Sequence, residues 1–183
     1  QVLSVEVHPR KTKLIEQSCE RLGLSNVAVA VADATDPQAL LDLLARHGRG
    51  DAGADAVVLD APCSGTGTLR RNPEHRYRSK DADELLALSE LQGRLLDSAA
   101  RAVRIGGTLT YSVCSPLLAE TEEAVAAFLK RHAGAFEIVE PSSALAAFHA
   151  NSAPLGGDAT CVRTWTHLHA ADSHFAASMR RVR

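Results

Sequence analysis

The sequence has a single methionine, four cysteines and almost no net charge. The methionine is Met179 and the chain begins with Gln1, so we expect these 183 residues to be part of a longer translation product. The sequence lacks a run of about 18 apolar residues, and it lacks a charged stretch followed by a short apolar block. Neither a membrane span nor a secretory signal is therefore predicted, and we expect a cytoplasmic protein with no membrane partner.

The cysteines lie far apart, without a CxxC pair or a dense disulfide pattern. They are Cys19, Cys63, Cys114 and Cys161. This spacing argues against a zinc ribbon or a secreted disulfide scaffold and favours free thiols in a reducing compartment. Metal binding is not expected either, because His167, His169 and His174 belong to no clear ligand set.

The net charge of -2 argues against a protein that is basic overall, so nucleic-acid binding would depend on a local patch. One such segment is the run RRNPEHRYRSK at 70–80, in which Glu74 is the single acid and Tyr77 lies among the bases. Its basic residues are Arg70, Arg71, Arg76, Arg78 and Lys80. Taken alone, this pattern favours a solvated loop.

Hydrophobic patterning predicts alternating strands and helices. Short apolar runs indicate strands, and apolar residues at three- and four-residue spacing indicate amphipathic helices. The predicted strands are 2–7, 27–32, 54–59, 108–113, 136–139, 161–168 and 175–182. The predicted helices are 10–22, 37–47, 81–103 and 119–132, the third ended by Gly106-Gly107, and 141–159 is a predicted loop. We expect one α/β domain with a mostly parallel sheet covered on both faces.

Polar or nucleophilic residues follow four of the predicted strands. They are Glu6, Asp33, Asp60 and Cys114. Because ligands of open parallel sheets bind outside the carboxyl ends of the strands, we expect these residues to share a functional rim. Glu6 suits the paired hydroxyls of a ribose, although a helix-capping or surface acid is the alternative. Asp33 suits an adenine amino group or, equally well, the start of a turn before Asp36-Pro37.

The cysteine at this rim has two interpretations. A free cysteine such as Cys114 is more often a small buried hydrophobe than a nucleophile. Its place at the end of a strand is, however, where a parallel sheet puts its chemistry. If the neighbouring strand carries the loop with Cys63, two thiols and Asp60 converge there.

Three motifs resemble those of the RNA cytosine-5 methyltransferases of the Sun or Fmu type, especially the small-subunit ribosomal RNA methyltransferase B branch. DAPCSGTG at 60–67, followed by RRNPE at 70–74, is similar to the fourth motif of the family. YSVCS at 111–115 is similar to its sixth, in which threonine is usual at the position of Val113. WTHLH at 165–169 and DSHF at 172–175 are similar to the final motif, with Ser173-His174 where Gly-Phe is commoner.

The resemblance runs from Val2 to Arg183 and implies a Rossmann-like, S-adenosylmethionine-dependent methyltransferase fold with an antiparallel C-terminal strand. It makes 1–183 a catalytic domain that lacks the first strand of the family and the glycine-rich loop that wraps the methionine part of the cofactor. That strand would precede Gln1 and lie centrally, between the strands that end at Glu6 and Asp60. An RNA-binding domain is expected further upstream.

The same resemblance implies methylation of carbon 5 of a cytidine in RNA, with small-subunit ribosomal RNA as the expected substrate. Carbon 5 is a poor nucleophile until a thiolate adds to carbon 6, and Cys114 is the implied nucleophile. Asp60 would contact N3 and the exocyclic amine of the base, and it must be protonated to donate to N3, which a desolvated pocket favours. Cys63 would assist proton removal and product release. The implied cofactor-binding residues are Glu6, Asp33, Asp60 and Pro62.

A cytosine stacked in RNA cannot offer both faces, so a splayed or flipped nucleotide is expected, and the basic run 70–80 becomes a predicted phosphate contact. Two alternatives remain open. The first is a nonenzymatic RNA-binding or assembly module that truly lacks the glycine-rich loop. The second is a methyltransferase of exocyclic amines, which would have no need for Cys114.

Overall fold

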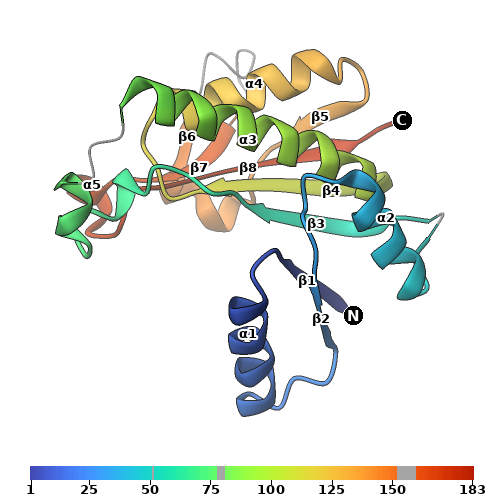
Figure 1. Cartoon of the computed structure of the whole chain (residues 1–183). Coiled ribbons are helices and arrows are strands. Elements are labelled where there is room, and N and C mark those ends of the chain that lie inside the picture. Colours follow the sequence, from blue (N-terminus) through green and yellow to red (C-terminus); the bar gives the residue numbers. More distant parts are fainter. Residues whose placement is uncertain (51, 78–80, 152–159) are drawn as a thin grey trace.

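The computed structural model describes residues 1–50, 52–77, 81–151 and 160–183. Its strands form two separate sheets (Figure 1). The smaller sheet is parallel and joins β1 (Val2–Glu6) to β2 (Val27–Val31). The larger sheet has the order β3-β4-β8-β7-β6, and β5 also pairs with β8.

The larger sheet is made of six strands. They are β3 (Ala54–Asp60), β4 (Val103–Val113), β5 (Phe136–Val139), β6 (His149–Asn151), β7 (Thr160–Thr164) and β8 (His174–Arg181). β3 is parallel to β4, whereas β8 is antiparallel to β4, β5 and β7. β3, β4, β5 and β7 therefore point in one direction, and β6 and the C-terminal strand β8 run against them. This arrangement confirms the predicted α/β fold with an antiparallel last strand.

Helices cover one face of the larger sheet. The helices are α1 (Pro9–Arg21), α2 (Pro37–Arg46), α3 (Ala82–Ala102), α4 (Glu122–Arg131) and the short α5 (Thr166–His169). α3 and α4 lie side by side above β4 and β8 (Figure 1). The core between these layers includes the fully buried side chains of Leu96, Leu109, Tyr111, Phe128, Phe175 and Met179.

The helix boundaries follow local signals in the sequence. The side chains of Asp36 and Asp81 accept hydrogen bonds from the backbone N–H groups of Gln38 and Glu84, so both aspartates cap helix N-termini. Gly23, the residue after the C-cap Leu22 of α1, adopts a φ of 67°, as expected of a glycine that ends a helix.

Three boundaries differ from the predictions. α3 ends at Ala102, one residue before its predicted end, and β4 begins at Val103 rather than at 108, because Val103 pairs with Ala54. The predicted helix 119–132 is a 3-10 turn, Leu118–Glu120, followed by α4. The predicted strand 161–168 is β7 followed by α5, since the ladder with β8 ends at Thr164. Within the predicted loop 141–159, a 3-10 turn (Ser143–Phe148) precedes β6, and 152–159 lie outside the described residues.

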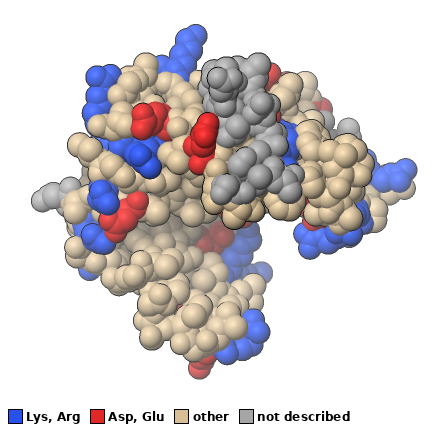
Figure 2. All heavy atoms as spheres, turned by 180° about the vertical axis from the view of Figure 1, so that it is seen from behind, with Lys and Arg blue, Asp and Glu red and all other residues tan. Residues whose placement is uncertain are grey.

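β1 and β3 do not pair with each other, and each is hydrogen-bonded to one strand in the described part of the chain. The β1–α1–β2 unit lies below β3 in Figure 1. Seen from behind, this unit forms a lobe that a recess separates from the main body (Figure 2). Val58 of β3 points away from the core and is 74% exposed. Covering on both faces, which the sequence predicted, is therefore wrong for β3.

In the described part of the chain, no helix combines the length and the apolar character needed to span a membrane.

Candidate active site

The ends of β3 and β4 bring the two motif cysteines together. Asp60 is the last residue of β3 and pairs in register with Ser112 of β4, so the two loops that follow leave the sheet at the same level. Cys63 lies in the first loop and Cys114 in the second. Their Sγ atoms are 3.3 Å apart, and both residues are partly buried. The predicted convergence of the two cysteine loops is confirmed.

This contact divides the roles of the two thiols. The hydrogen bond from Cys63 lowers the pKa of Cys114 to about 7, against the opposing effects of burial and of the Asp60 and Glu120 carboxylates. The same hydrogen bond, together with burial, raises the pKa of Cys63 far above its ordinary value. Near neutral pH Cys63 is therefore the S–H donor, and Cys114 is the group that ionises.

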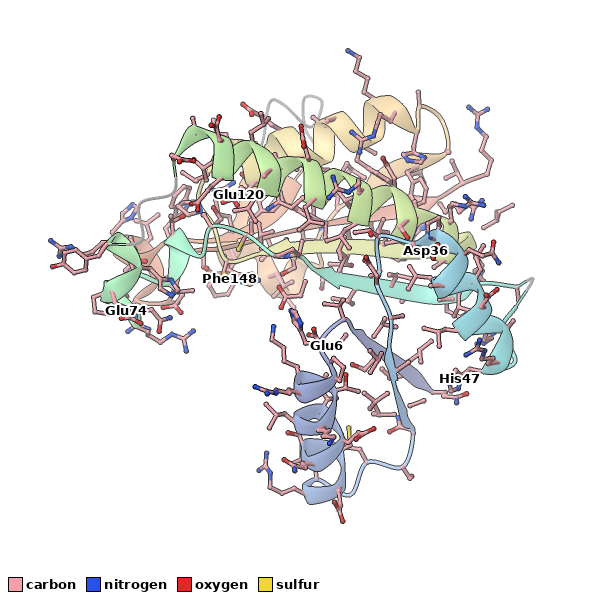
Figure 3. The ribbon with its side chains drawn as sticks, viewed as in Figure 1. Glu6, Asp36, His47, Glu74, Glu120 and Phe148 are labelled. Atoms are coloured by element: carbon pink, nitrogen blue, oxygen red, sulfur yellow. The ribbon has the colours of Figure 1, made fainter. Side chains whose placement is uncertain are left out.

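A buried carboxylate lies behind both cysteine loops. Glu120 is 1% exposed and accepts hydrogen bonds from Ser64, which follows Cys63, and from Ser115, which follows Cys114. Figure 3 shows Glu120 at this end of the sheet, below the N-terminal half of α3. Sequence analysis did not assign Glu120 to the site and placed it only within the predicted helix 119–132. The signal available was its position six residues after Cys114.

Gly67 joins the cysteine loops to the last strand. Its N–H donates to the carbonyl oxygen of Cys114 at 3.0 Å, and its own carbonyl accepts from the N–H of Ser173 at 2.9 Å. A Cβ on Gly67 would collide with the carbonyl oxygen of Ser173. The glycine thus allows three backbone segments of the site to meet. Gly65 has a different function, because its φ of 70° turns the chain.

His174 is a second residue that sequence reasoning did not assign to the site. It begins β8, and its Nε2 lies 2.6 Å from the Oγ of Ser112, the residue paired with Asp60. His174 and Asp60 are both exposed. The desolvated pocket expected around Asp60 is therefore not formed by the described residues alone.

Pro62 is an exposed residue of the loop after β3, and its backbone carbonyl is hydrogen-bonded to a buried side chain. Its oxygen accepts a hydrogen bond from Gln92 Nε2 at 2.9 Å, and Gln92 is completely buried in α3. The loop after β3 is thereby tied to the helix that covers the sheet.

The two predicted cofactor carboxylates lie on the smaller sheet. Glu6 ends β1, and its Oε1 accepts from the N–H of His8 at 2.9 Å. Asp33 follows β2, and its Oδ1 accepts from both the N–H and the hydroxyl of Thr35 at 2.8 Å, which lowers the pKa of Asp33. Asp33 therefore forms the turn that was one of its two interpretations. Residues His8 to Lys11 line a depression of about 600 Å³ directly after Glu6.

These carboxylates are separated from the cysteines by the unpaired edges of β1 and β3. Figure 3 shows Glu6 on the side of its unit that faces β3, whereas Glu120 lies within the main body. The sequence predicted one shared rim, and the structure divides it between two sheets.

The basic segment is partly neutralised. Asp172 lies 2.5 Å from Arg71 and 3.5 Å from Arg70, so two of the five predicted RNA contacts are in ion pairs. Arg76 instead lies over the ring of Tyr77, 5.2 Å from its centroid, and Tyr77 is 79% exposed. The other two predicted contacts, Arg78 and Lys80, lie outside the described residues.

Comparisons with known proteins show which proteins the chain resembles. The family model described as 16S rRNA methyltransferase RsmB/F matches residues 1–180. The chain is 39% identical over 181 residues to Rv1407 of Mycobacterium tuberculosis, a protein named as a methyltransferase. The matched region covers 99% of this chain and 35% of that protein. It is 40% identical over 128 residues to the ribosomal RNA small subunit methyltransferase B of Xylella fastidiosa, covering 70% of this chain and 28% of the relative.

Solved structures share the fold. The crystal structure of PH0851 superposes with a TM-score of 0.83 and 31% identity, covering 99% of this chain and 37% of that one. NSun6 from Pyrococcus horikoshii, solved with SFG, gives a TM-score of 0.78 at 24% identity, over 100% of this chain and 42% of that chain. The chain thus spans about a third of the length of the curated relatives described above.

Proposed function

Because the chain belongs to the RsmB/F family of 16S rRNA methyltransferases, we propose that it carries the catalytic centre of an RNA cytosine-5 methyltransferase. The reaction transfers a methyl group from S-adenosylmethionine to carbon 5 of a cytidine, through a covalent bond between Cys114 and carbon 6. Small-subunit ribosomal RNA is the proposed substrate. The observation that carries the proposal is the 3.3 Å contact between Cys63 and Cys114.

Cys114 is suited to begin the reaction. With its pKa lowered to about 7, a large part of the residue is thiolate at neutral pH, and the thiolate is the nucleophilic form. Its addition to carbon 6 moves the electron pair of the 5,6 double bond, so that carbon 5 becomes enamine-like. Asp60, at the end of the adjacent strand, is proposed to contact N3 and the exocyclic amine and to stabilise the altered ring.

Cys63 is suited to the later step, in which the proton on carbon 5 must leave. While Cys114 is ionised, the hydrogen bond to it is the largest cause of the raised pKa of Cys63. Once Cys114 is bound to carbon 6 its sulfur is an uncharged thioether, and that cause is removed. Cys63 can then release its own proton to solvent, and the thiolate so formed accepts the proton on carbon 5. The 5,6 double bond re-forms as the bond from carbon 6 to Cys114 breaks, and the Cys114 thiolate is restored.

S-adenosylmethionine would supply the electrophilic methyl group. The acceptor chemistry of the smaller sheet fits its nucleoside part, because Glu6 and Asp33 are carboxylates at the ends of two adjacent parallel strands. Glu6 is proposed to accept from the ribose hydroxyls, and Asp33 from the adenine amino group through the oxygen that Thr35 does not use. Asp60 and Pro62, at the end of β3, are the proposed cofactor contacts on the larger sheet.

A further strand is proposed to lie between β1 and β3. Both strands have an edge without a partner in the described part of the chain, and the exposed Val58 lies on the face of β3 that no helix covers. Insertion of a strand would pair both edges and unite the two carboxylates with the cysteines in one sheet. Coding sequence upstream of Gln1 is the place to look, and a strand followed by a glycine-rich loop there would support the proposal.

The proposed test uses the protein expressed from its whole open reading frame. It is incubated with unmodified small-subunit ribosomal RNA and labelled S-adenosylmethionine, and the RNA is digested to detect 5-methylcytidine. The variants are Cys114→Ala, Cys63→Ala and, as a matched control on α1, Cys19→Ala.

The wild type and Cys19→Ala are expected to form 5-methylcytidine, Cys114→Ala to be inactive, and Cys63→Ala to accumulate a covalent protein–RNA adduct. Activity that survives in Cys114→Ala would favour methylation of an exocyclic amine. RNA binding without transfer in the wild type would favour a nonenzymatic module.

A further inference from the structure

We propose that Glu120 is a positioning residue that clamps the Cys63 loop against the Cys114 loop. It acts through the serine that follows each cysteine, Ser64 and Ser115, and so holds the two sulfur atoms in contact. This inference rests on the proposed function, and it adds to that function a residue outside both cysteine motifs.

The first carboxylate oxygen of Glu120, Oε1, binds the loop after β3. Oε1 accepts from the backbone N–H of Ser64 at 2.7 Å and from Gln92 Nε2 at 3.3 Å. The same amide nitrogen of Gln92 donates to the carbonyl of Pro62 at 2.9 Å. Two backbone groups that flank Cys63 are therefore held by one pair of buried side chains.

The second carboxylate oxygen bridges the two loops. Oε2 accepts from the hydroxyl of Ser64 at 2.6 Å and from the hydroxyl of Ser115 at 2.5 Å. The two hydroxyls are also 3.3 Å from each other. A single oxygen thus joins the residues next to Cys63 and Cys114, which lie in the loops after two different strands.

Glu120 itself is held in place by the core. The hydroxyl of Tyr111, which is completely buried, donates to the backbone carbonyl of Glu120 at 2.7 Å. Burial of a carboxylate is costly unless donors surround it, and here four donors meet its two oxygens. An ionised carboxylate has acceptor sites for all four, which explains why this buried position suits glutamate.

Two effects of Glu120 on Cys114 have opposite signs, and this makes the proposal testable. As a negative charge, Glu120 raises the pKa of Cys114, as Asp60 also does. As a clamp, it preserves the hydrogen bond from Cys63, which lowers that pKa more strongly. Loss of the clamp should therefore raise the pKa of Cys114 although a negative charge has been removed.

The experiment measures the alkylation of Cys114 by iodoacetamide between pH 5 and 10, with each cysteine followed by peptide mass spectrometry. The whole protein is used, without RNA. Glu120→Ala removes all four interactions. Glu120→Gln keeps an oxygen for Ser64 N–H and Gln92, and its amide can donate to the two serine hydroxyls after they rotate. Glu123→Gln, at an exposed site in the first turn of α4, is the matched charge control.

We expect a midpoint near pH 7 for the wild type and for Glu123→Gln. In Glu120→Ala the midpoint should move toward an ordinary thiol, with alkylation at pH 7 slowed about tenfold. Glu120→Gln should keep the midpoint of the wild type or fall slightly below it. An unchanged or lower midpoint in Glu120→Ala would overturn the proposal.

If Glu120→Ala does not fold, as judged by circular dichroism, the same alkylation experiment on Ser115→Ala tests the proposal, because this variant loses only one bridging hydroxyl. A raised Cys114 midpoint supports the clamp, and an unchanged one overturns it. Since no methyl transfer is measured, a failure of the proposed reaction is detected separately, by the absence of 5-methylcytidine in the wild type.

Discussion

The N–H of Gly67 donates a 3.0 Å hydrogen bond to the carbonyl oxygen of Cys114, and a Cβ on Gly67 would lie 2.8 Å from that same oxygen. The position thus has no room for a side chain, because the same Cβ would lie even closer to the carbonyl oxygen of Ser173. The backbones that carry the two cysteines and the start of β8 meet at this point.

Gly67→Ala is expected to destabilise the protein by about 2–4 kcal/mol and to reduce methyl transfer by more than about tenfold, because the two backbones must move apart. Urea unfolding and single-turnover assays measure the two effects. Gly93→Ala in α3 is the control, since its Cβ would meet only the tip of Arg131 at 3.7 Å. It should be neutral or stabilising by about 0.5–1 kcal/mol. Equal behaviour of the two variants would contradict this account of Gly67.

The pH dependence of the reaction should follow Cys114. Its thiolate is the proposed nucleophile and its pKa is lowered to about 7, so the single-turnover rate should fall about tenfold per unit below pH 7 and level off above it. Cys63→Ala removes the largest cause of that lowering. The rate of adduct formation in this variant should therefore reach its midpoint at a higher pH. A midpoint that stays near pH 7 would show that the hydrogen bond between the thiols is not its cause.

The buried ion pair between Arg163 and Glu122 should matter for stability. The two side chains are 4% and 8% exposed, and the guanidinium also lies 4.8 Å from the ring centroid of Trp165 and 5.1 Å from that of Phe175. Arg163→Ala leaves a carboxylate buried without its cation and is expected to cost about 3–5 kcal/mol in the free energy of unfolding. Arg180→Ala, at an exposed site in β8, should change it by less than about 0.5 kcal/mol. Comparable losses in both variants would argue against a special role for the pair.

RNA affinity should depend more on Arg76 than on Arg71. Arg76 and the exposed ring of Tyr77 offer a cation and a stacking surface, whereas Arg71 is paired with Asp172. Arg76→Ala should weaken binding roughly threefold to tenfold and lower the salt dependence by about one counterion. Arg71→Ala should have a smaller effect. Asp172→Asn should strengthen binding, because it leaves two arginines unneutralised. Filter binding over a range of salt concentrations tests all three, and weaker binding by Asp172→Asn would refute the argument.

Much of the fold follows from local patterns that the sequence displays directly. The apolar repeats of α1, α2 and α3 act over one or two turns of helix, so they predict helices close to those observed. The start of β4 was predicted less well, at 108 rather than at Val103. Val103 could continue the helix by pattern, and only its pairing with Ala54 assigns it to a strand.

The sequence by itself determined the residue types at the site, because Cys63 and Cys114 follow two apolar strands and lie in motifs that together resemble those of one family. Only the tertiary structure decided how this chemistry is held. The position of Glu120 behind both loops and the separation of β1 from β3 depend on contacts between residues distant in the chain. No local pattern encodes such contacts, since their energy comes from packing and hydrogen bonding that exist only after the sheet and its helices have assembled.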